Sequence, residues 1–263
     1  MLKGIRAIIS DMDGVLWRGM QPLPGLHDFF TYMSDKHMGF VLATNNSSKT
    51  QMNYVEKLSA LGVNGVQPWH IVTSGTATAS YLRTKFPPGT RIFVVGGAGL
   101  KQILTKAGFR LVEDDADLVV CGIDTDLTYE KLSKATLLIR GGAGFIGTNP
   151  DSSFPSPEGL VPGAGSILAL LEAASGQRPI VIGKPSRGMF EAALRQLNTE
   201  PEETLMIGDR IGTDIEGARA LGIKTALVMS GVEDDSSLSA SQTKPDCVFE
   251  GLPDLVAALK RGG

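Results

Sequence analysis

Short apolar runs alternate with helix-like segments along most of the chain. The runs are continuous instead of alternating with polar residues, which is typical of strands that are covered on both faces of a sheet. Segments between them, such as SRGMFEAALRQL at 186–197, place their apolar residues on one helical face. This alternation predicts βαβ units and a parallel sheet. The predicted strands are 7–9, 40–43, 71–72, 92–95, 118–121, 180–182, 205–207 and 226–229.

The spacing of these segments also predicts a second domain. After the helical pattern at 76–86, the sequence FPPG at 86–89 is typical of a linker, and residues 90–180 carry their own strand–helix alternation. We therefore predict a core domain of residues 1–85 and 182–263 with an inserted α/β domain of residues 86–181. The Gly- and Pro-rich segment 141–165 is expected to be a strand with long loops.

Polar clusters follow four of the predicted strands. In an open parallel α/β sheet, ligands bind beyond the carboxyl ends of the strands, so the clusters meet in one place if the four strands are neighbours. Each cluster alone has a plain structural explanation, such as a turn, a solvated lysine or a helix N-cap; their conjunction indicates a site. The clusters are Asp11 with Asp13, Thr44 with Asn45 and Asn46, Lys184, and Asp209 with Asp214.

The charges of these clusters point to a metal and a phosphate. Four aspartates in one cleft repel one another, and their pKa values rise unless a cation is present. Oxygen ligands without His or Cys favour Mg²⁺, which commonly binds a few carboxylates together with phosphate oxygens. Lys184 and the hydroxyl and amide groups at Thr44 and Asn45 suit the remaining phosphate oxygens.

These motifs resemble those of a known family. The segments DMDGV (11–15), ATNN (43–46), GKP (183–185) and GDRIGTD (208–214) resemble the four motifs of haloacid-dehalogenase (HAD) superfamily phosphohydrolases. The segments TNPD (148–151), PGAGS (162–166) and VIGKPSRGMFEAAL (181–194) resemble the NagD-like branch, which includes p-nitrophenyl, phosphoglycolate and pyridoxal phosphate phosphatases. The resemblance covers almost the whole chain. It implies a doubly wound, Rossmann-type parallel sheet with an inserted α/β cap domain.

The resemblance also implies a role for each motif residue. Asp11 would be the nucleophile that forms an aspartyl-phosphate, and Asp13 the general acid and then the general base. Thr44, Asn45 and Asn46 would bind the phosphoryl group, and Lys184 would hold nucleophile and phosphate together. Mg²⁺ would be bound by Asp11, the Asp13 carbonyl and Asp209, with Asp214 on the metal's waters or on Lys184. In the cap, Asn149 and Asp151 are candidate substrate contacts, unless TNPD is only a turn fixed by Pro150.

Three other functions stay open at this point. A receiver-like signalling module also combines acidic residues, a strand-end Thr and a Lys, but it is about half this length and lacks an inserted domain. A phosphate-ester-binding protein without turnover would not need Asp13. A phosphomutase or phosphotransferase of the same superfamily would replace water by a second acceptor. The substrate expected for a phosphatase is a sugar phosphate, phosphoglycolate, a nucleoside monophosphate or a similar metabolite.

Composition and charge limit the kinds of binding partner that we expect. A net charge of −3 and a pI near 5.7 give no electrostatic reason to expect nucleic acid or an anionic membrane. No apolar run approaches the roughly 18 residues of a membrane span, and the N-terminal apolar stretch is too short for a signal peptide. Cys121 and Cys247 lack metal or redox spacing, so a cytoplasmic protein is expected, as monomer or homodimer. The segment RIFVVGGAGLKQ (91–102) imitates a dinucleotide fingerprint but has Gln102 at the third glycine position.

Overall fold

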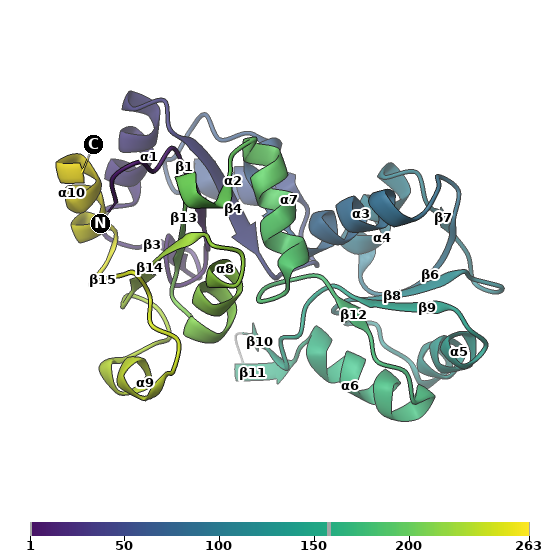
Figure 1. The fold of residues 1–263 in the computed structure, drawn as a ribbon. Helices are drawn as coiled ribbons and strands as arrows, with labels where there is room; N and C mark the ends of the chain where they lie inside the picture. Colours follow the sequence, from purple (N-terminus) through teal and green to yellow (C-terminus); the bar gives the residue numbers. More distant parts are fainter. Residues whose placement is uncertain (1, 157–158, 263) are drawn as a thin grey trace. The chain divides into compact units, whose positions relative to one another are not determined.

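The computed structural model describes residues 2–156 and 159–262, which form two compact units (Figure 1). The core unit comprises Met1–Thr44, Gln51–Val72 and Phe190–Gly263, and the inserted unit comprises Asn45–Thr50 and Thr73–Met189. The predicted domain borders at 85/86 and 181/182 stay a prediction. By their contacts, residues on both sides of these borders belong to the inserted unit.

The core unit is built on a six-stranded sheet in the order β15-β14-β13-β1-β4-β5. The strand pairs from β15 to β4 are parallel, and Ile8 in the middle of β1 lies opposite Leu205 of β13 and Phe40 of β4. Every residue of β1 and β13 is buried, which explains their continuous apolar sequences. The strands are β1 (Ala7–Ser10), β4 (Gly39–Thr44), β5 (Ile71–Thr73), β13 (Thr204–Gly208), β14 (Lys224–Val228) and β15 (Cys247–Phe249), with a small antiparallel hairpin of β2 (Trp17–Arg18) and β3 (Gln21–Pro22).

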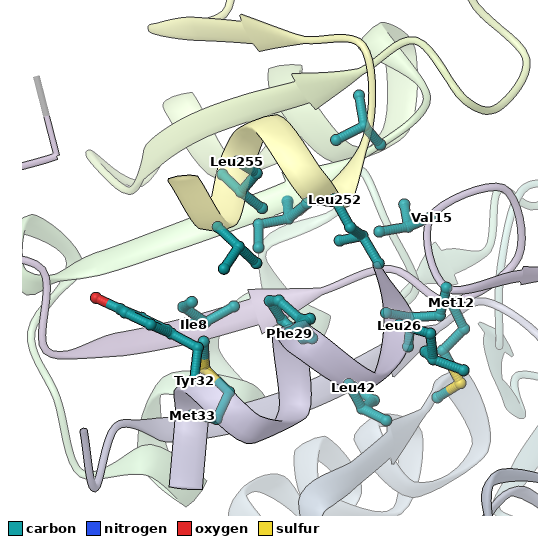
Figure 2. Packing of buried hydrophobic residues seen from close by; sticks show 14 of the residues in the cluster. Ile8, Met12, Val15, Leu26, Phe29, Tyr32, Met33, Leu42, Leu252 and Leu255 are labelled. Carbon is teal, nitrogen blue, oxygen red and sulfur yellow. The ribbon is translucent and has the colours of Figure 1, made fainter. Parts of the chain in front are cut away.

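Helices bury their apolar faces against this sheet. Figure 2 shows Phe29 and Tyr32 of α1 and Leu255 of α10 gathered with Ile8 of β1 and other members of one apolar cluster. The Tyr32 hydroxyl donates to the Leu259 carbonyl over 3.2 Å, which ties α1 to α10. The helices and helical turns are α1 (Leu26–Asp35), α2 (Gln51–Ala60), η1 (Pro68–His70), α7 (Arg187–Leu197), η2 (Pro201–Glu203), η3 (Ile211–Ile215), α8 (Glu216–Arg219), α9 (Asp235–Ala240) and α10 (Leu252–Gly262).

The inserted unit has its own parallel sheet of five strands in the order β12-β9-β8-β6-β7. An apolar cluster joins Phe93 of β6 and Val119 of β8 to Ile139 of α5 and Leu171 of α6. The strands are β6 (Arg91–Val95), β7 (Arg110–Leu111), β8 (Leu118–Cys121), β9 (Gly144–Gly147) and β12 (Ile180–Val181), with an antiparallel pair of β10 (Ser153–Ser156) and β11 (Gly159–Pro162). The helices are α3 (Ser74–Lys85), α4 (Ala98–Lys106), α5 (Tyr129–Arg140) and α6 (Ala164–Ser175).

Side chains and glycine set the helix ends of this unit. Thr73 accepts a hydrogen bond from the Thr76 N–H and caps α3, and Thr128 accepts one from the Lys131 N–H and caps α5. Gly176 ends α6 in the left-handed conformation, with φ of 77°. Residues next to the helices in the chain therefore set these three helix ends.

The predicted α/β class with a parallel-sheet core and an inserted α/β domain is confirmed. The condition that all four strands are neighbours is met by three of them. Residues Ile180–Val181 of the run at 180–182 form β12, which pairs with β9 of the inserted unit and does not join the core sheet beside β1, β4 and β13. Within the described part of the chain, no helix combines the length and the apolar character that crossing a membrane requires.

Candidate active site

Three of the four predicted polar clusters follow strands that are neighbours in the core sheet. The order β13-β1-β4 places the ends of these strands side by side. Asp11 follows β1 directly, and its N–H donates to the Ile207 carbonyl of β13 over 2.8 Å, so the strand pairing continues to the aspartate. Asp209 follows β13 and Thr44 is the last residue of β4. The sheet itself therefore brings Asp11, Thr44 and Asp209 to one edge.

Three carboxylates form a cluster at this edge. One oxygen each from Asp11, Asp209 and Asp214 lies within 4.8 Å of the others, and Asp209 and Asp214 are buried. The Val232 N–H donates to Asp209 Oδ2 over 3.0 Å and the Arg210 N–H to Asp214 Oδ2 over 3.2 Å. These backbone hydrogen bonds orient two of the three carboxylates. Asp214 lies inside the π-helical turn η3, so it does not cap the helix that follows.

Glycines make room for the cluster, which we call the carboxylate site. Gly14 has φ of +89°, and a Cβ there would lie 2.2 Å from Asp209 Oδ2. A Cβ on Gly231 would lie 2.0 Å from the same oxygen, and one on Gly208 would lie 2.2 Å from Asp214 Cβ. Real Cβ atoms are essentially never found at such distances, so a larger residue at any of the three positions would displace a carboxylate of the site.

The carboxylate site fits a hard divalent cation. It gathers three carboxylates with oxygen atoms close enough to share one ion, and no His or Cys belongs to the group. Oxygen-only ligand sets suit Mg²⁺. Such a cation would offset the mutual repulsion of the three carboxylates.

Asp13 is not part of this cluster of side chains. Its Oδ1 accepts a hydrogen bond from Trp17 Nε1 over 2.8 Å and lies 3.9 Å from Lys57 Nζ. Its side chain is 61% exposed. The structure thus gives the two aspartates of DMDGV different surroundings: Asp11 faces two carboxylates, and Asp13 faces a ring N–H and an ammonium group.

A buried tyrosine borders both aspartates. Tyr54 of α2 is 2% exposed, and its pKa is raised, chiefly by burial and next by the negative charge of Asp13. The polar side chain of Thr44 acts in the opposite direction, and the charge of Asp11 adds a smaller increase in the pKa. The Tyr54 hydroxyl therefore keeps its proton across the physiological pH range and stands beside Thr44.

In the inserted unit, Asn45 is bound to the backbone of Lys184. The Lys184 N–H donates to Asn45 Oδ1 over 2.8 Å, and Asn45 Nδ2 donates to the Lys184 carbonyl over 2.9 Å. Lys184 is 3% exposed. The position of the Lys184 backbone thus depends on the residue that follows Thr44 in the chain, and the strand before Lys184, β12, belongs to the second sheet.

The two cap candidates of the TNPD segment join the same network. Asn149 is buried and its Nδ2 donates to the Asn45 carbonyl over 2.7 Å, while Asn45 Nδ2 also lies 3.1 Å from Asp151 Oδ1. Asn46 Oδ1 accepts hydrogen bonds from the N–H and the hydroxyl of Ser48, which closes a turn. The substrate and phosphate roles of these residues stay predictions, and the structure shows which protein groups they contact.

Sequence reasoning did not single out Tyr54 or Lys57. Tyr54 and Lys57 are three residues apart on α2, which places them on one helical face. That spacing is the signal in the sequence, but it becomes informative only when α2 is known to lie beside the DMDGV loop.

Comparison with known proteins agrees with this geometry. A family model described as haloacid dehalogenase-like hydrolase matches residues 8–110, and one described as HAD-hydrolase-like matches residues 181–255. The acid sugar phosphatase of Staphylococcus epidermidis is 37% identical over 99% of this chain and 100% of its own length. The dihydroxyacetone phosphatase of Corynebacterium glutamicum is 38% identical over 94% of this chain and 89% of its own.

Solved structures show the same fold. The 4-nitrophenylphosphatase of Thermotoga maritima has a TM-score of 0.93 and 39% identity, with 98% of each chain covered. NagD from E. coli has a TM-score of 0.89 and 33% identity over 94% of this chain and 97% of its own. A glycerol phosphate phosphatase of Mycobacterium tuberculosis in complex with magnesium has a TM-score of 0.88 and 30% identity over 97% of this chain and 77% of its own.

The chain belongs to the haloacid dehalogenase-like hydrolases. Within that family it lies in the NagD-like phosphatase branch, and the predicted class of enzyme, a HAD-type phosphoric monoester hydrolase, is confirmed.

Proposed function

We propose that this chain is a Mg²⁺-dependent phosphatase of small-molecule phosphate monoesters, with Asp11 as the nucleophile. The observation that carries the proposal is the carboxylate site, in which the residue at the end of the central strand β1 shares a cluster with Asp209 and Asp214. The names of the relatives support a substrate among sugar phosphates and related three-carbon phosphates. Phosphoglycolate and nucleoside monophosphates are further candidates.

Two half-reactions follow from these roles. The Asp11 carboxylate attacks phosphorus, the bond from phosphorus to the ester oxygen breaks, and Asp13 gives a proton to the departing alcohol. Water then loses a proton to Asp13 and attacks the phosphorus of the aspartyl-phosphate, which releases inorganic phosphate and restores Asp11. Each half-reaction uses Asp13 in the opposite protonation state, so one exposed carboxyl group serves both.

The remaining residues would stabilise negative charge. Mg²⁺ bound by Asp11, Asp209 and the Asp13 carbonyl, with Asp214 beside it, would neutralise the carboxylates and the phosphoryl oxygens. Lys184 would add a positive charge, and Thr44, Asn45 and Asn46 would supply hydrogen bonds to the phosphoryl group. Asn45 would also fix the Lys184 backbone, through the two hydrogen bonds that join them.

The test begins with p-nitrophenyl phosphate and purified protein. We expect hydrolysis with Mg²⁺ and loss of activity when a chelator is added. Asp11→Asn should lower turnover about a thousandfold or more, whereas Asp28→Asn, at an exposed position of α1, is the matched control. Rapid quenching and mass spectrometry should find a phosphoryl group on the peptide that contains Asp11.

Two outcomes would contradict the proposal. Full activity in the Asp11→Asn protein, with its circular dichroism unchanged, excludes Asp11 as the nucleophile. Release of less inorganic phosphate than alcohol from glycerol phosphate, in the presence of a second sugar, indicates transfer to that sugar and thus a phosphotransferase.

A further inference from the structure

The carboxylate of Asp13 is held by two residues that the four motifs do not include. Trp17 is fully buried in β2, and its indole N–H donates to Asp13 Oδ1 over 2.8 Å. The backbone closes the same loop, because the Gly14 N–H donates to the Trp17 carbonyl over 2.8 Å and the Leu16 N–H to the Met12 carbonyl over 2.8 Å. The donor therefore sits on a rigid support.

Lys57 adds a second contact from α2. Its Nζ lies 4.1 Å from the centre of the Trp17 ring, within the range of a cation–π interaction, and 3.9 Å from Asp13 Oδ1. The Lys57 side chain is only 13% exposed, and it lies three residues after Tyr54 on the same helical face. Lysine, tryptophan and aspartate thus form one contiguous group, which we call the Asp13 clamp (Asp13, Trp17 and Lys57).

The clamp restrains an exposed side chain. The Asp13 side chain is 61% exposed, and an exposed aspartate ordinarily moves among rotamers. A proton donor is effective only when it is held in line with the oxygen that it protonates, since misplacement of a reacting group by even an ångström lowers the rate strongly. The buried indole fixes one carboxylate oxygen and leaves the group accessible to a substrate.

We propose that Trp17 and Lys57 are positioning residues that hold the Asp13 carboxylate in its reactive orientation. The inference rests on the proposed function, because it takes Asp13 as the group that protonates the departing alcohol. Neither residue touches the reacting atoms; each acts through Asp13. Their effect should therefore depend on how much the departing alcohol needs a proton.

The experiment compares two esters in the same variants. p-Nitrophenolate is a stable anion and needs little protonation, whereas the alkoxide leaving from glycerol phosphate needs a proton. We expect Trp17→Phe, which keeps an aromatic ring but removes the N–H, to lower kcat/KM for glycerol phosphate about tenfold and for p-nitrophenyl phosphate less than about twofold. Trp69→Phe, at a tryptophan that is 60% exposed, is the matched control and should leave the ratio of the two values unchanged.

Lys57 provides a variant that does not disturb the buried core. Lys57→Met removes the charge but keeps the unbranched stem, and we expect a smaller selective loss for glycerol phosphate, about threefold. Lys57→Arg keeps a cation over the ring and should recover at least half of that loss. Urea denaturation of each variant shows whether it is folded. Unfolding lowers kcat/KM for both esters by the same factor, so it is distinguished from the selective loss for glycerol phosphate.

A double-mutant cycle with Asp13→Asn tests whether Trp17 acts through Asp13. If Trp17 acts through Asp13, Trp17→Phe has no further effect on kcat/KM in the Asp13→Asn protein. Additive losses, or equal losses for both esters in folded Trp17→Phe and Lys57→Met, overturn the positioning role while the proposed phosphatase stands. If Asp13→Asn itself lowers kcat/KM by the same factor for both esters, the acid role of Asp13 fails and the positioning proposal fails with it.

Discussion

Replacement of Gly14 by alanine should damage both the fold and the metal site. Gly14 has φ of +89°, a left-handed conformation that costs an L-residue about 1–2 kcal/mol. The new methyl group would also lie 2.2 Å from Asp209 Oδ2 and 3.2 Å from the Gly231 Cα, so the Asp209 carboxylate must move. Forcing extra atoms into a packed site typically costs about 1–3 kcal/mol. Together we expect Gly14→Ala to lower the free energy of unfolding by about 2–5 kcal/mol.

Gly65→Ala separates strain from displacement of the carboxylate. Gly65 has φ of +86°, almost that of Gly14, but a Cβ there meets no atom within 4 Å. Its replacement should therefore cost only the backbone strain of about 1–2 kcal/mol and leave activity unchanged.

Two measurements check this prediction. Urea denaturation gives the stability of both variants, and titration of activity with Mg²⁺ gives the half-saturating concentration. For Gly14→Ala we expect that concentration to rise about tenfold or more, because the orientation of a ligand to the metal is lost. If Gly14→Ala and Gly65→Ala match in both stability and Mg²⁺ dependence, the room that glycine leaves for Asp209 does not matter and the reasoning is refuted.

Three further predictions concern other contacts of the same units. Mg²⁺ at 100 times its dissociation constant should stabilise the wild type against urea by about 2.7 kcal/mol, and Asp209→Asn should remove most of that gain; an equal gain in both proteins would place the ion elsewhere. Because burial raises the folded-state pKa of Tyr54 above 10, its stabilising contribution is complete below pH 10 and is lost as the pH rises toward the folded pKa. The urea midpoint of Tyr54→Phe should therefore fall less between pH 9 and pH 11 than that of the wild type. Equal falls in the two proteins would contradict the raised pKa of Tyr54. Asn45→Asp removes the donor to the Lys184 carbonyl and sets a carboxylate against that of Asp151, so it should destabilise the protein by about 1–3 kcal/mol. Asp151→Asn in the same chain should restore part of the lost stability. If it restores none, repulsion between the two carboxylates is not the cause of the loss.

Much of the fold could be predicted from the pattern of the chain. Strand β8 has the predicted bounds, and β1, β4 and β13 differ from prediction by one residue at one or both ends. Their residues are nearly all buried, so a continuous apolar run was a strong signal. Helix α7 begins one residue after the predicted start at 186 and ends at the predicted residue 197, since apolar periodicity marks it.

Weak local signals explain what was not predicted. Strand β12 has only two residues, Ile180 and Val181, and such a short run does not specify which sheet it joins. The hairpin of β2 and β3 is also two residues per strand, too short for a visible alternation. Helix α2 has only Tyr54 and Leu58 buried, so its apolar face gave little signal.

The sequence by itself determined which chemical groups stand at the ends of the strands. The residues that follow β1, β4 and β13 are covalent neighbours of buried runs, and this local relation survives whatever the strand order is. It was enough to indicate an oxygen-rich cation site among Asp11, Asp13, Asp209 and Asp214.

Only the tertiary structure decided which of these groups meet and what supports them. Strand order placed Asp11 beside Asp209, which is almost 200 residues away in the chain, and it assigned β12 to another sheet. The contacts of Asp13 with Trp17 and Lys57 and the hydrogen bonds of Asn45 to Lys184 depend on the packing of elements distant in sequence. Local pattern fixes the direction and burial of each element, but the pairing of distant elements depends on the whole core.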